Sequence, residues 1–476
     1  MFKKIPRVYV AVAISIIVLF YVLSNIRRNN DSQTGMSPSR SLRTTTNQKF
    51  DVPSRRFAGA ETLRNAKSGD LIAEIEKLIQ QNGLPADVFA DDRQSDERNV
   101  DDPTNIAVTL QNLFQEYSKK EPNDLQKLWA ASPIGAWDID EQAFNSVRPT
   151  FAKLETKRQV VRKMLNQHAT THFNYIFNRP KLGAFLYVHT KVDTAASQYL
   201  ADYTLLEEYA IAQALLDENI GAATEALAYI FRIAQLASEL GNIGVRSDAA
   251  LVRLRAFDIM QRVVLDPQFD KAQMIFLRDM LSEQHEHWTS EYEAWFGDRA
   301  SGIALYHRLM MNGPENALES AEFELMESRW GRNKFMRGFT KYREADEVFY
   351  LRSMQKVLDV SNKPFVKRLD VLNQINKGMT DKEDTFDENG ISTEHFVAYL
   401  LLKDVDRLMR IFAQDQSALN RALVVILRSL GQSNTDNYRD PFTDEPYKVQ
   451  KVDGLLSISA TRLLRPFRVP IFMDKE

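Results

Sequence analysis

The sequence predicts a mainly α-helical protein: an antiparallel helical array or bundle with one N-terminal transmembrane helix and a small C-terminal β-hairpin. Three observations predict this fold. A long uncharged apolar run lies near the N-terminus, apolar residues repeat at helical spacing through most of the chain, and two short β-prone runs lie near the C-terminus. Of the 476 residues, 44% are hydrophobic and 26% are charged, which is typical of a globular protein with a substantial core.

The apolar run covers residues 8–26 and contains no charged side chain. A helix of that length spans roughly 28 Å, close to the ~30 Å hydrocarbon thickness of a bilayer. The run is longer than the apolar part of a cleaved signal peptide, and no small-residue cleavage pattern follows it. A short tail (1–7) before a large body is usual for a signal anchor, so we expect the body outside the cytoplasm.

Residues 27–68 are rich in Ser, Thr, Asn and Arg and predict a flexible stalk, with contact to anionic lipid head groups as the alternative. A helical segment with an acidic loop (87–103) is expected over 69–124, and a helical body over 125–431. Within that body, helices are expected over 201–216, 222–240, 246–265, 335–360, 363–377 and 392–430, with one more after Asp270.

Residues 432–476 depart from the helical pattern. The runs YKVQKV and LLSIS flank Asp453-Gly454, and Asp-Gly between two β-prone runs is a strong signal for a type I′ hairpin. A lone hairpin is marginal in water, so this one must pack on something. It either caps the helical body or offers a free strand edge to a partner.

The C-terminal tail also carries a resemblance. Residues 440–447 read DPFTDEPY. They resemble the D-P-F-[ST]-G-x-P-[LY] tail of large, uncharacterised single-pass bacterial membrane proteins with a helical body, although Asp444 stands where Gly is usual. They are also similar to the Asp-Pro-aromatic loop of type II secretion pseudopilins. Residues 215–240 resemble the helical-pair core of the single-pass proteins, and 297–302 resemble their Glu-Arg-Ala turn.

The resemblance implies a place in the bacterial inner membrane, with a periplasmic body, and implies no activity. No prepilin cleavage site precedes the apolar run, which argues against a pseudopilin. The candidate interaction residues are those of the tail: Asp440, Pro441, Phe442, Pro446 and Tyr447.

Residue spacing excludes several kinds of metal site. The chain has no cysteine, which removes disulfides, thiolate metal sites and a cysteine nucleophile. His168 and His172 share a helix face, but Ala169 stands where a zincin needs Glu. None of the seven histidines has a Glu three residues before it, as di-iron sites require, and the acidic run 381–390 fails the EF-hand register. We therefore expect no metal and no cofactor.

The sequence contains no nucleotide-binding or hydrolase motif, and its formal net charge of -3 does not indicate nucleic-acid binding. The leading hypothesis is a membrane-anchored extracytoplasmic helical interaction or scaffold protein, which contacts lipid through its anchor and has a possible protein partner. The alternative is a carboxylate-dependent enzyme, for example a hydrolase, on a helical-array scaffold. Two converging carboxylates with shifted pKa values in a pocket would favour the enzyme, and a flat apolar patch the interaction protein.

Overall fold

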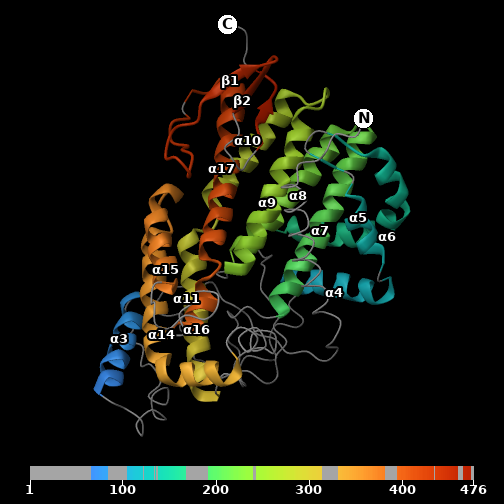
Figure 1. Cartoon of the computed structure of the whole chain (residues 1–476). Helices are drawn as coiled ribbons and strands as arrows, with labels where there is room; N and C mark the ends of the chain where they lie inside the picture. The colour runs from blue at the N-terminus through green and yellow to red at the C-terminus, as the bar shows by residue number, and fades with distance from the viewer. Residues whose placement is uncertain are drawn as a thin grey trace, which may run out of the picture.

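The computed structural model describes the parts of the chain between residues 66 and 472, with gaps, and shows a mainly helical protein with a small antiparallel sheet (Figure 1). The predicted anchor, nearly all of the predicted stalk and the acidic loop lie outside the described residues. No helix in the described ranges has both the length and the apolar character to cross a bilayer. These ranges are 66–83, 104–121, 123–132, 134–135, 138–167, 191–239, 243–312, 331–380, 394–433, 435–458 and 465–472.

Buried apolar side chains form two clusters. The first core is built by helices α4 to α10, the C-terminal part of α17 and the sheet. Its apolar stripes repeat at helical spacing, as in α8, where Ala223, Leu227 and Ile230 are buried. The helices of the first core are α4 (Ile106–Lys120), α5 (Asp124–Ala131), α6 (Glu141–Leu165), α7 (Lys191–Leu216), α8 (Ile220–Ser238), α9 (Ile243–Val264) and α10 (Lys271–His287).

The second core is built by the remaining helices and the beginning of α9. The helices of the second core are α3 (Ala66–Asn82), α11 (Glu291–Asn312), α14 (Arg332–Val360), the 3-10 helix η3 (Phe365–Arg368), α15 (Leu369–Thr380), α16 (Phe396–Leu402) and α17 (Val405–Ser429). α17 enters both clusters, since Met409 lies in the second core and Leu423 in the first. α9 also contributes to both clusters, with Ala250 in the second core and Ile259 in the first. α9 and α17 therefore connect the two cores (Figure 1).

Local signals explain where several helices begin. Asn219 caps α8 by accepting a hydrogen bond from the N–H of Ala222 at 3.1 Å. Asp270 and Gln273 form a capping box at the start of α10. Short connections join α7, α8 and α9, which lie side by side in Figure 1 as an antiparallel group.

Three sequence expectations differ from the structure. The expected turn at 297–302 lies inside α11, where Gly302 packs against the ring of Tyr350, so this glycine permits a close helix approach instead of a turn. The expected helix at 392–430 is two helices, because α16 ends at Leu402 and α17 begins at Val405. The expected helix at 363–377 begins as η3 and continues as α15.

The predicted hairpin is present and has a third strand beside it. β1 (Val449–Val452) pairs antiparallel with β2 (Leu455–Ile458), and β3 (Phe467–Val469) pairs with the other edge of β2. Asp453 and Gly454 both have positive φ (54° and 78°), as a type I′ turn requires. The sheet contacts α17 and α9, and its buried side chains belong to the first core.

Candidate functional site

The tail residues singled out from the sequence mostly contact the body of the same chain. Asp440 is buried, and its Oδ1 accepts the backbone N–H of Phe442 at 2.9 Å. The Phe442 ring lies 5.4 Å from that of Phe365 in η3, and the carbonyl of Pro441 accepts the N–H of Val366 at 3.4 Å. This loop therefore packs on the second core.

The second half of the tail returns to the first core. The Tyr447 hydroxyl lies 3.1 Å from the Ser417 hydroxyl on α17. Pro446 is exposed and forms an isolated bridge with Arg439. Asp444, where the resemblance drawn from the sequence predicts Gly, adopts a left-handed conformation with φ 61°, which Asp tolerates better than most residues.

A buried charged network lies between α6 and α7 in the first core. Glu207 is completely buried, and four donor groups point at its carboxylate. Arg158 donates from Nη1 at 2.9 Å, Arg162 from Nε at 2.9 Å and from Nη2 at 2.6 Å, and the Tyr203 hydroxyl at 2.8 Å. Burial and the Glu207 charge raise the pKa of the Tyr203 phenol, so it stays a donor. The network fixes α6 against α7.

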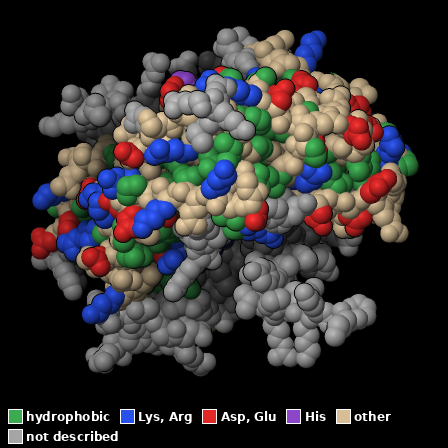
Figure 2. Space-filling view, turned by 90° about the horizontal axis from the view of Figure 1, so that it is seen from above, with side chains coloured by type: hydrophobic (Ala, Val, Ile, Leu, Met, Phe, Trp, Pro, Cys, Tyr) green, Lys and Arg blue, Asp and Glu red, His purple; other side chains and the backbone are tan. Residues whose placement is uncertain are grey.

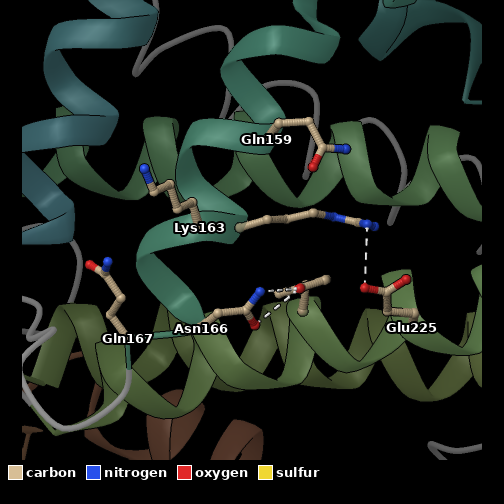
Figure 3. A pocket seen from close by; sticks show the side chains of 7 residues that line it. Gln159, Lys163, Asn166, Gln167 and Glu225 are labelled. Atoms are coloured by element: carbon tan, nitrogen blue, oxygen red, sulfur yellow. Dashed lines mark hydrogen bonds and ion pairs between the residues drawn. The ribbon is translucent and has the colours of Figure 1, made fainter.

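A polar pocket opens beside this network, between the C-terminal end of α6 and α8 (Figure 3). Its volume is about 440 Å³, within the usual range for small-ligand sites. Figure 3 shows Gln159 and Lys163 on one side of the pocket, with Asn166 and Glu225 opposite them. The full lining is Gln159, Arg162, Lys163, Asn166, Gln167, Glu225 and Tyr229.

One wall of the pocket is held by reciprocal hydrogen bonds. Asn166 Nδ2 donates to the Tyr229 hydroxyl at 2.8 Å, and that hydroxyl lies 3.0 Å from Asn166 Oδ1. Arg232 Nη1 also donates to Asn166 Oδ1, at 3.1 Å. The Arg162 guanidinium lies over the Tyr229 ring, 4.4 Å from its centroid, in cation–π geometry. These contacts hold the Asn166, Tyr229 and Arg162 side chains against one another.

The second core holds buried carboxyl groups in a different setting. Burial raises the pKa of Asp298 to about 7. Burial also raises the pKa of Asp346 to about 7, although its two oxygens accept the N–H groups of Val397 (2.9 Å) and Ala398 (3.0 Å) at the start of α16. The pocket between α6 and α8 contains neither residue.

A third charged feature lies where α9 and α17 pass between the cores. Arg253 is fully buried and holds Asp415 through Nε (2.6 Å) and Nη2. Its guanidinium lies 3.3 Å from the centroid of the Trp288 ring. Arg246 lies 4.4 Å from the same ring, and burial lowers its pKa to about 9. These contacts join the two cores through charge as well as apolar packing.

The described residues show no group of three His, Asp or Glu side chains placed to hold a metal ion. His168, His172 and the acidic run 381–390 lie outside the described residues. The large exposed apolar side chains are scattered over different helices, and Figure 2 shows apolar and charged side chains interleaved on the face seen from above. Such scattered residues are ordinary at protein surfaces.

Sequence reasoning missed the pocket and the network beneath it. The available signal was spacing: Arg158 and Arg162, like Tyr203 and Glu207, are four residues apart and share a helix face. The resemblance drawn from the tail stays a prediction. No family model, no curated protein and no solved structure matches the chain.

Proposed function

We propose that the chain is a membrane-tethered helical scaffold that binds partners and catalyses no reaction. The observation that carries this proposal is the use of buried charge in the body. Glu207 and Asp415 face arginines, and Asp346 holds the start of α16. Carboxylates placed in this way fix helices relative to one another, which is what a rigid scaffold requires.

The tether is the uncharged segment 8–26, with the body outside the cytoplasm at the bacterial inner membrane. The partner is a protein that meets the C-terminal sheet. Two features support this contact. Pro446 is exposed beside the sheet, and β1 pairs only with β2 among the described strands, so its outer edge can accept an added strand.

The tether is tested by fractionation of the full chain. We expect the chain to stay with membranes after alkaline carbonate extraction, and Ile17→Arg to release it, because a charge in the middle of the segment opposes insertion. Reporter fusions after residue 60 should place the body outside the cytoplasm. Recovery of the unaltered chain in the soluble fraction would contradict the tether, and cytoplasmic reporter activity would contradict the orientation.

The second candidate function is a carboxylate-dependent hydrolase, and one observation favours it. Asp298 and Asp346 both have pKa values of about 7, which suits a general acid or base. Tyr350 lies near Asp298, because its hydroxyl donates to the Asp298 carbonyl at 3.2 Å. The Tyr306 ring lies 5.6 Å from the Tyr350 ring. Turnover of chromogenic ester, phosphoester or glycoside substrates that disappears in Asp298→Asn would favour this enzyme over the scaffold.

A further inference from the structure

Arg246 on α9 is a buried cation whose donor groups have no acceptor among the described residues. The residue is 4% exposed, and its Nε and Nη1 atoms are buried without a hydrogen-bond partner. Its guanidinium lies against two rings, 4.4 Å from the centroid of Trp288 and 5.6 Å from that of Phe412. These rings attract the cation, but they offer no oxygen atom to accept its hydrogen bonds. A buried donor in this state is the kind of group that a bound water or ion satisfies.

The carboxylates that act on Arg246 are already held by other arginines. Asp415 and Glu291 both favour its charged form, but burial is the larger influence and lowers its pKa to about 9. Asp415 accepts from Nε and Nη2 of Arg253. Glu291 accepts from Nη1 and Nη2 of Arg368. Three arginines therefore share two carboxylates, and one buried positive charge is left in excess among the described residues.

Another buried arginine shows how such a group can be satisfied without a carboxylate. Arg299 donates from Nη1 to the carbonyl of Gly83 at 2.9 Å, and from Nη2 to the carbonyl of Leu78 at 2.8 Å, at the end of α3. Arg246 has no hydrogen bond to a carboxylate or a carbonyl of any described residue. Its surroundings therefore differ from those of Arg299, although both side chains are buried.

Further unbonded donors lie close to the same ring. The Arg253 guanidinium lies 3.3 Å from the centroid of the Trp288 ring, and its Nη1 atom is buried without an acceptor, as is Trp288 Nε1. One unbonded buried acceptor, Gln284 Oε1, lies a helical turn before Trp288 in the chain. Donors thus exceed acceptors in this part of the structure. An anion only accepts hydrogen bonds, whereas a water must also donate them, so the excess favours an anion.

We propose that a small monovalent anion, chloride, binds beside the Arg246 guanidinium, where α9, the end of α10 and α17 pack together (Figure 1). A monatomic ion suits the place because Arg246 is almost completely covered by the protein. The ion offsets the excess buried charge where α9 and α17 connect the two cores, so it stabilises the folded body. This binding requires neither the membrane tether nor the contact at the C-terminal sheet.

The test is thermal unfolding of the full-length chain in a non-ionic detergent, with sodium gluconate exchanged for sodium chloride at constant ionic strength. A ligand that binds only the folded state stabilises it. We therefore expect the melting temperature to rise by about 1–2 °C for each tenfold increase in chloride above the dissociation constant. Sodium bromide should act in the same way. A melting temperature that does not depend on halide would overturn the proposal, and it is the result expected if water satisfies Arg246.

Two variants locate the effect. Arg246→Gln removes the charge that holds the ion, so its melting temperature should not change with chloride. Arg407→Gln makes the same replacement on α17, at a side chain that is 56% exposed, and should keep the full dependence on chloride. If Arg246→Gln responds to chloride as strongly as Arg407→Gln, the proposal is wrong.

A direct measurement does not depend on the folding of any variant. Bromide scatters X-rays anomalously, so crystals of the original chain grown in sodium bromide should show an anomalous peak beside the Arg246 guanidinium. The absence of a peak there overturns the proposal, even where the melting temperature responds to halide. The fractionation test of the tether is unaffected by either result.

Discussion

Glu207 in the first core and Asp298 in the second are buried carboxyl groups in opposite settings. In the first core, Glu207 lies between two arginines and a tyrosine, which together supply four donor groups. In the second core, Asp298 is also buried, and burial alone sets its pKa at about 7. Thus a similar degree of burial produces a paired group in one core and a group that resists ionisation in the other.

This difference shows that partners decide how a buried charge affects stability. The Glu207 carboxylate is needed most by Arg162, because without it this buried arginine would keep only the Glu225 carboxylate 4.0 Å away, whereas Arg158 would keep Glu155. The Asp298 carboxylate has no cation to stabilise it among the described residues, so its ionisation opposes folding. Glu207 and Asp298 should therefore respond differently to substitution, and only Asp298 should contribute the pH dependence described below.

The largest effect is expected in the paired network. Glu207→Gln keeps the size of the side chain but removes the buried anion that Arg158 and Arg162 share, so that Arg158 keeps only Glu155 and Arg162 only Glu225 at 4.0 Å. We expect a loss of about 3–5 kcal/mol in the free energy of unfolding, measured by urea denaturation. The control is Glu155→Gln, which alters an ion pair of Arg158 at a carboxylate that is 39% exposed and should cost no more than about 1 kcal/mol. Equal losses would mean that burial does not distinguish the two pairs.

The next effect is the pH dependence contributed by the second core. The folded-state pKa of Asp298, about 7, lies above its ordinary value of 3.8, so the folded chain binds a proton that the unfolded chain releases. This contribution to stability is complete below pH 4, is lost as pH rises to about 7, and approaches about 1.4 kcal/mol per pH unit. Asp298→Asn should remove it.

Chemical denaturation of both proteins from pH 5 to pH 8 measures this difference. The amide group that replaces the carboxyl group cannot ionise, so we expect the unfolding free energy of Asp298→Asn, relative to that of the original chain, to rise by about 3 kcal/mol from pH 5 to pH 8. Parallel pH profiles for the two proteins would show that Asp298 ionises normally, and the contrast between the cores would then fail.

The third prediction compares a glycine in each core that is replaced by alanine. Gly302 lies against the Tyr350 ring in the second core, and an added methyl group would collide with that ring. Gly302→Ala should cost about 1–3 kcal/mol in thermal unfolding, although Ala is the better helix former. Gly221 in α8 has only Asn219 Oδ1 near the same position, at 3.7 Å, so Gly221→Ala should be neutral or slightly stabilising. A similar response at both sites would rule out the close approach in the second core.

The sequence predicted the parts of the fold that depend on local pattern. Apolar spacing predicted α8 and α9 nearly to their ends, and the Asp453-Gly454 pair predicted the hairpin turn. It did not predict β3, because a strand of three residues is too short to show alternation. The sequence also predicted a single helical body. The structure instead has two hydrophobic cores, and both α9 and α17 contribute side chains to each of them.

The charged network and the pocket beside it could not be predicted from local sequence patterns, and the reason is physical. Arg162 and Glu207 are 45 residues apart in the chain, and only the packing of α6 against α7 brings them together. Helical spacing shows which residues share a face of one helix, but not which faces meet. The tail residues were predicted as interaction residues from a resemblance, and the structure places Asp440 and Phe442 against the chain's own body.

The smallest effect concerns the tail, which contacts both cores. The Tyr447 hydroxyl meets buried Ser417, so Tyr447→Phe should cost about 1 kcal/mol in unfolding free energy if the tail caps the helices. Pro446→Ala, at an exposed site, should cost nothing. Truncation after Gly431 extends the test, because a cap predicts lost stability or aggregation, whereas a docking element predicts an unchanged melt and lost partner capture. If neither Tyr447→Phe nor the truncation changes stability or capture, the segment neither caps the body nor docks a partner.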